Sequence, residues 1–154
     1  MAQIVYLKLR IAGNIIEGES RKHDLDRENT IECYSFEHGG IFNSGTKFSN
    51  IVIQKPFDRS SPFLVKAMKE RQNVDRAEFM FFNTDMQGRD VKFYTFLAEN
   101  GFVNGVHQFN EDDIIGGENC PPLIEKVTFS IKGQLTWTNE IFGNEYRTSV
   151  SGNE

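Results

Sequence analysis

The sequence predicts a mainly β fold, a small antiparallel β-barrel of two packed sheets with one flanking α-helix at about residues 61–72. Short runs of alternating apolar and polar residues recur along the chain, and turn residues separate them. One segment instead has the spacing of an amphipathic helix. No repeat or linker divides the 154 residues of the sequence, so we expect a single domain over residues 1–154.

The first expected strand covers residues 5–11, and its alternate apolar residues share one face: Val5, Leu7, Leu9 and Ile11. Further strands are expected at about 30–37, 46–55, 77–84, 90–98 and 102–109. The pair 77–84 and 90–98 flanks a turn segment and is predicted to be a hairpin. Closing such short strands into a barrel protects their edges, so we expect closure rather than an open sheet.

The clearest alternation lies in residues 124–138. One face is apolar and is expected in the core: Val127, Phe129, Ile131, Leu135 and Trp137. The other face is polar without being acidic: Lys126, Thr128, Ser130, Lys132, Gln134 and Thr136. Gly133 interrupts the run at the position where a bend or bulge costs least.

The predicted helix begins at a Ser-Ser-Pro sequence. Ser61 is expected to accept a hydrogen bond from an unpaired backbone N–H at the helix start, and Pro62 suits the first helical position. Leu64, Ala67 and Met68 line one face of the helix. A helix of about ten residues is too short to be stable alone, so we expect this face to dock on the barrel.

Charge and composition exclude several classes of partner. The 22 acidic residues exceed the 17 basic ones, giving a formal net charge of −5, whereas a protein that binds nucleic-acid phosphates leans the other way. No apolar run approaches the ~20 residues of a membrane span. From the net charge and the lack of such a run, we expect neither nucleic acid nor membrane as a partner. The N-terminus lacks the pattern of a signal peptide. Cys33 and Cys120 are predicted to be reduced thiols in a protein made in the cytoplasm.

Catalysis or metal binding is a weaker interpretation of three groups of residues. The charged residues from 23 to 28 do not share one face of a helix, and a loop between strands explains them more simply. His107 is interpreted as a partly buried or interface histidine. Ser60 and Ser61 lack the glycine-flanked turn of a hydrolase nucleophile. We therefore expect no enzyme activity, no catalytic residue, no metal and no cofactor.

A motif in residues 55–67 carries a resemblance to a known family. Its pattern is K-P-x-D-x-S-S-P-x-L-x-x-A, formed by Lys55, Pro56, Asp58, Ser60, Ser61, Pro62, Leu64 and Ala67. This pattern resembles the signature of the haemolysin-coregulated protein family, Hcp, the tail-tube proteins of type VI secretion systems. Gly18-Glu19-Ser20 with His23, the strand at 31–37 and the stretch 125–131 are similar to the family in the same order. The resemblance covers nearly the whole chain.

The resemblance implies a structural subunit that forms six-membered rings, which stack into a hollow tube. It implies that a contracting sheath propels the tube out of the cell, with spike and baseplate proteins as further partners and effector proteins carried in the lumen. Such a protein is made in the bacterial cytoplasm without a signal peptide and is secreted by the type VI system. A monomeric, lipocalin-like barrel that binds a small ligand is the alternative.

Two surfaces are expected to serve such a tube. The loop after the strand at 31–37 combines three glycines with two apolar side chains, and it is expected to reach the next ring and bury them there. Its residues are Gly39, Gly40, Ile41, Phe42, Asn43, Ser44 and Gly45. A hairpin loop folded back onto its own barrel is the alternative interpretation. The polar face of residues 126–136 is expected to line the lumen, where an apolar surface would retain cargo.

Overall fold

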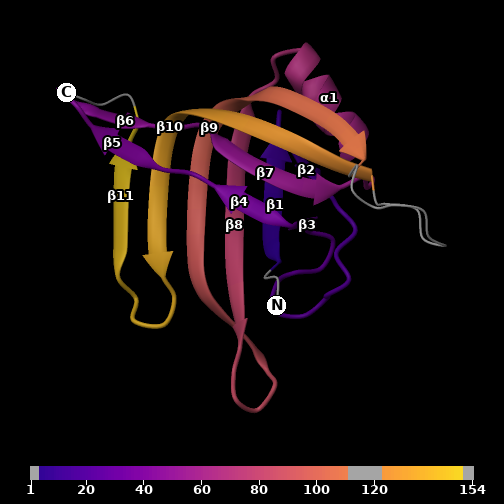
Figure 1. The fold of residues 1–154 in the computed structure, drawn as a ribbon, viewed down its shortest axis with the longest axis vertical. Helices are drawn as coiled ribbons and strands as arrows, with labels where there is room; N and C mark the ends of the chain where they lie inside the picture. Colours follow the sequence, from indigo (N-terminus) through magenta and orange to yellow (C-terminus); the bar gives the residue numbers. More distant parts are fainter. Residues whose placement is uncertain (1–3, 111–122, 151–154) are drawn as a thin grey trace.

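The computed structural model describes residues 4–110 and 123–150, shown as a ribbon in Figure 1. The strands are, in chain order, β1 (Val5–Ile11), β2 (Asn14–Ile16), β3 (Ile31–Cys33), β4 (Ser35–Glu37), β5 (Gly40–Phe42), β6 (Thr46–Phe48), β7 (Ile51–Pro56), β8 (Val74–Thr84), β9 (Asp90–Asn110), β10 (Leu123–Asn139) and β11 (Glu145–Ser149). Helix α1 (Ser61–Lys69) lies between β7 and β8. The predicted mainly β fold with one flanking helix is confirmed within the described residues. Within them no helix has the length and apolarity to cross a bilayer.

Nine of the strands form one antiparallel sheet with the order β2-β1-β8-β9-β10-β7-β4. The long strands β9 and β10 bend over the top of the molecule in Figure 1 and carry the sheet round towards α1. At the two ends of the sheet, β3 pairs with β1 and β4 pairs with β7. The segment 31–37 therefore bridges the ends, but its ladder breaks at Tyr34. We expected closure from the sequence, and this expectation is wrong: no continuous ladder closes the barrel within the described residues.

Several strand boundaries differ from the prediction for physical reasons. Residues 30–37 were expected to form one strand, but the chain changes its pairing partner at Tyr34 and so forms β3 and β4. Residues 90–98 and 102–109 belong to the single strand β9, because Asn100 adopts a left-handed φ of 64° at a bulge instead of ending the strand. Strand β11, which pairs with β10, gave no signal in the sequence.

The core lies inside the curved sheet. The alternate apolar residues of β1 are buried as predicted, and so are Val127, Phe129 and Leu135 of β10. Aromatic rings fill the centre: Phe79 lies with its ring centroid 5.0 Å from that of Phe36 and 6.3 Å from that of Phe129. Cys33 is a buried free thiol, whereas Cys120 lies outside the described residues.

Helix α1 docks as expected but starts differently from the prediction. Leu64 and Ala67 are buried in the core, and Met68 packs against it. The residue at the N-cap is Ser60, whose side chain makes no capping bond, so the prediction that Ser61 caps the helix is wrong. Ser61 is the first helical residue and Pro62 the second. The helix ends at Lys69 rather than near residue 72, because Arg71 turns the chain with a left-handed φ of 53°.

Gly133 occupies the register shift between β9 and β10, as its place in the alternation predicted. A Cβ atom there would lie 2.4 Å from the backbone oxygen of Glu99. Replacing Gly133 with Ala therefore forces the two strands apart, and we expect the free energy of unfolding to fall by about 1–3 kcal/mol. Urea denaturation measures this change.

The matched control is Gly105→Ala in β9, where the added Cβ would lie 3.9 Å from Thr128. This ordinary contact requires no shift, so we expect a change within about 1 kcal/mol. Equal loss of stability in both variants would contradict the close approach at Gly133.

Candidate functional site

The β5–β6 hairpin projects from the side of the molecule opposite α1 (Figure 1). It forms a two-stranded sheet of its own, in which Ile41 pairs with Lys47. The turn at its tip has left-handed φ angles at Ser44 and Gly45. The side chains of Ile41 and Phe42 are 64% and 77% exposed. The loop predicted from its glycines is thus a short hairpin that presents two apolar side chains to solvent.

The base of this hairpin is fixed. The ring of His38 lies among those of Phe48, Phe96 and Trp137, with centroid distances of 6.0, 4.9 and 6.4 Å. Burial lowers the pKa of the His38 imidazole, so the ring is neutral at pH 7. The backbone N–H of Gly39 donates to the Ser49 hydroxyl at 2.9 Å. The hairpin therefore has an anchored base, and its tip exposes apolar side chains to solvent.

The Lys55 to Ser61 motif forms a buried ionic network. Lys55 of β7 and Glu125 of β10 are both 0% exposed, and the Lys55 Nζ lies 2.7 Å from the Glu125 Oε1. The same Nζ lies 3.1 Å from the Asp58 carboxylate and donates to the backbone oxygen of Pro56 at 2.9 Å. One buried ammonium thus balances two carboxylates and has a backbone acceptor.

Ser61 connects this ionic pair to the start of α1. Its hydroxyl donates to Glu125 Oε1 at 2.8 Å and accepts a hydrogen bond from the backbone N–H of Asp58 at 3.0 Å. The Asp58 carboxylate in turn accepts hydrogen bonds from the backbone N–H and the hydroxyl of Ser60. Gln108 of β9 donates to the second oxygen of Glu125 at 2.6 Å. The two serines therefore have a role that helix capping does not explain.

The surroundings of Glu125 act on its pKa in opposite directions. Burial alone would raise the pKa of this carboxyl, because the charged form loses its hydration. Hydrogen bonds from Lys55, Gln108 and Ser61 outweigh that effect and hold the pKa below its usual value. Glu125 is therefore a carboxylate at neutral pH.

The polar face of β10 is largely accessible. Lys126, Lys132 and Gln134 are exposed, and Thr128 and Ser130 are half-buried. Thr136 departs from the prediction: it is buried, and among the described residues its Oγ1 has no hydrogen-bond partner. Leu135 and Trp137 still pack in or against the core beyond the register shift, so the alternation continues, but Thr136 does not belong to the accessible surface.

The charged segment from residue 23 to 28 is a loop held by ion pairs, as expected. Asp26 pairs with Lys8 at 2.6 Å, and Arg27 pairs with Asp24 at 2.7 Å and Asp90 at 3.0 Å. Arg27, which the sequence did not single out, is buried above the ring of Phe82, 4.3 Å from its centroid. Within residues 4–110 and 123–150, no group of three or more acidic, His or Cys side chains could hold a metal ion.

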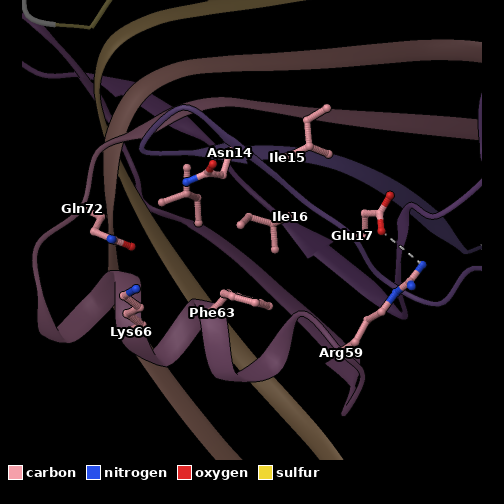
Figure 2. Close-up of a pocket in the computed structure, with 9 residues that line it drawn as sticks. Asn14, Ile15, Ile16, Glu17, Arg59, Phe63, Lys66 and Gln72 are labelled. Atoms are coloured by element: carbon pink, nitrogen blue, oxygen red, sulfur yellow. Dashed lines mark ion pairs between the residues drawn. The ribbon is translucent and has the colours of Figure 1, made fainter.

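A groove of about 350 Å³ lies between β2 and α1 (Figure 2). Ile16 and Phe63 face one another across it, with Ile15 on its upper side. Glu17 and Arg59 form an ion pair of 3.7 Å at one end. The sequence gave no sign of this groove, because its two walls come from segments that are far apart along the chain.

Comparisons with known proteins agree on one family. The family model described as "Type VI secretion system effector, Hcp" matches residues 6–138. A curated relative, "Major exported protein" from Pseudomonas aeruginosa, is 26% identical over 106 residues, covering 66% of this chain. The matched part spans 61% of that relative, which is less than two thirds of its length.

Solved structures of Hcp proteins have the same fold. A mutant Hcp1 from E. coli EAEC 042 gives a TM-score of 0.82 at 25% identity, covering 95% of this chain and 97% of the other. Secreted protein Hcp3 from Pseudomonas aeruginosa gives 0.80 at 19% identity, covering 98% of this chain and 100% of the other.

Removing the buried ammonium is expected to be strongly destabilising. Lys55→Met leaves the carboxylates of Glu125 and Asp58 buried without their cation, and we expect a loss of about 3–5 kcal/mol in the free energy of unfolding. The control is Lys8→Met, which removes an exposed ion pair with Asp26 and should cost less than about 1 kcal/mol. Chemical denaturation of both variants measures the difference. Similar small losses would show that the buried network contributes little.

Stability should fall in acid partly through Glu125. Its folded pKa lies below its unfolded value, so its contribution is complete above the unfolded pKa of about 4.3 and is lost as the pH falls through the folded pKa. Glu125→Gln cannot titrate, and we expect its denaturation midpoint to depend less steeply on pH below about 4.3. Comparing slopes between the two proteins removes any constant cost of the substitution. Parallel slopes would contradict the lowered pKa.

Proposed function

The chain belongs to the Hcp family of type VI secretion systems, and on this basis we propose that it is the subunit of a secreted tail tube. In this proposal six subunits close into a ring, and rings stack into a hollow tube. The β5–β6 hairpin is the observation that carries it, because an anchored stem presents the apolar pair Ile41 and Phe42 to solvent. Such a pair stabilises an assembly by roughly 1.5–3 kcal/mol for each side chain that becomes buried.

The same proposal assigns the polar face of β10 to the lumen. Lys126, Lys132 and Gln134 are exposed there, and an apolar patch is absent from these positions. A polar channel wall lets effector proteins pass without sticking, since large apolar patches promote association. A contractile sheath, spike and baseplate proteins are the further partners, and secretion through this system is the route out of the cell.

The alternative of a monomeric ligand-binding barrel has less support. Phe79, Phe96 and Phe129 are buried inside the curved sheet and pack against one another, whereas a ligand cup needs an open interior. Family membership also fits a structural role better than a catalytic one.

Native mass spectrometry of the purified protein tests the ring. At tens of micromolar we expect a species with the mass of six subunits. Because contacts within a cyclic ring are heterologous, each subunit uses two different faces, and the ring closes at a fixed number. A spectrum with monomer alone would contradict the tube-subunit proposal.

The variant Ile41→Ser with Phe42→Ser separates stacking from ring stability. Since both side chains are exposed in the subunit, we expect the melting temperature of the ring to stay nearly unchanged while tube growth and secretion are lost. Electron microscopy and a secretion assay measure these effects. The control is Met86→Ser, at the tip of another turn, where the side chain is 99% exposed and tubes should persist. A double variant that is markedly destabilised yet still stacks would refute the stacking role.

A further inference from the structure

We propose that the tip of the β5–β6 hairpin of one subunit docks in the groove between β2 and α1 of a neighbouring copy. This inference rests on the proposed tube function and names the surface that receives the hairpin. The groove is lined by Ile15, Ile16 and Phe63. The side chains proposed to insert into it are Ile41 and Phe42 of the other copy.

Within residues 4–110 and 123–150, no third strand pairs with the hairpin. Among the described residues, β5 and β6 pair only with one another. A two-stranded hairpin alone is at best marginally stable in water, and three or more strands with an apolar face are needed for independent stability. Aromatic rings hold its base, but its tip has no such support. The tip therefore gains most from an additional strand and an apolar surface together.

The groove offers both a strand edge for pairing and an apolar surface. Strand β2 ends the path of the sheet and pairs with β1 alone among the described strands, so its second edge is free to accept a strand. Beside this edge, Ile16 and Phe63 face one another across the groove and make its walls apolar (Figure 2). Ile15 is 66% exposed and Phe63 is 52% exposed, although both are large apolar residues. A strand laid along β2 would cover them.

The charges of Lys47 in the hairpin and Glu17 in the groove favour the same contact. The only charged residue between positions 39 and 49 is Lys47, which lies directly across the hairpin from Ile41. Glu17 follows β2 immediately, at the end of the groove. Its carboxylate lies 3.7 Å from the Arg59 guanidinium, which donates shorter bonds of 2.8 Å to the backbone oxygen of Gly18 and to Asn29. Glu17 can thus accept a second cation without displacing the stronger partners of Arg59.

The contact must form between copies. In Figure 1 the hairpin lies on the opposite side of the subunit from β2 and α1, which form the walls of the groove, so a hairpin cannot reach its own groove. A contact between two different faces is heterologous, and its repetition gives a closed ring or an open stack. Each copy then contributes one tip and fills one groove.

Cysteine cross-linking tests the contact directly. A chain carrying Asn43→Cys and Lys66→Cys, in a Cys120→Ser background, is treated with a short bismaleimide. Both positions are exposed, Lys66 lines the groove, and the apolar side chains of the tip and the groove are kept. Burial raises the pKa of the Cys33 thiol, so that residue stays unreactive. We expect a ladder of linked dimers, trimers and longer species on a denaturing gel. Chains with either cysteine alone should give no ladder.

The matched control tests another exposed turn as the occupant. It combines Met86→Cys with Lys66→Cys and should give no ladder. Rings detected by native mass spectrometry without a 43–66 link, or a ladder only with residue 86, would overturn the docking inference and leave the tube function standing. Monomer alone in the mass spectrum would overturn both.

Charge reversal provides a second, independent test. Lys47→Glu and Glu17→Lys should each reduce the linked fraction in the 43–66 pair, and the two together should restore it. Both substitutions are on exposed side chains, so the subunit itself should keep its melting temperature. Equal cross-linking in all three variants would contradict the predicted approach of Lys47 to Glu17.

Discussion

The buried pair of Lys55 and Glu125 is the constraint on which the rest of the subunit depends. Burying two charges is costly, and their attraction offsets the cost only where the geometry is good and the remaining polar atoms are satisfied. Both conditions hold here. Lys55 bonds to Glu125, Asp58 and a backbone oxygen, and Glu125 also accepts hydrogen bonds from Ser61 and Gln108. Because these residues come from β7, β10, β9 and the start of α1, one network sets the positions of three strands and the helix.

The ionic network also determines which side chains α1 presents at the surface. Ser61 fixes the first turn of α1, and the burial of Leu64 and Ala67 fixes its rotation. Phe63 is then left on the side that faces β2, which creates the groove of Figure 2. The motif is therefore a structural device whose consequences appear several residues away. A similar division holds at the hairpin, where the aromatic rings packed around His38 anchor the base and leave the tip exposed.

The local sequence pattern was sufficient to predict an element wherever one face of that element is buried. The alternation of β1 and of residues 124–131 predicted their buried faces, and Pro62 with the spacing of Leu64 and Ala67 predicted the helix. It failed where the outcome depends on distant partners. The role of Ser61 required Glu125, which lies 64 residues away, and the change of pairing at Tyr34 required both β1 and β7. The groove was invisible for the same reason, since no local pattern relates Ile16 to Phe63.

The size of the proposed contact explains why a ring would precede a tube. Two buried side chains contribute roughly 3–6 kcal/mol, whereas association costs roughly 4–15 kcal/mol in lost translational and rotational freedom. One hairpin in one groove is therefore too weak to hold two subunits together. When several subunits are already joined in a ring, the association cost is met once and each further contact forms at a high effective concentration. The stacking of preformed rings would then be strong, while stray pairing of single subunits would remain weak. A hairpin with only two apolar side chains at its tip is consistent with this balance.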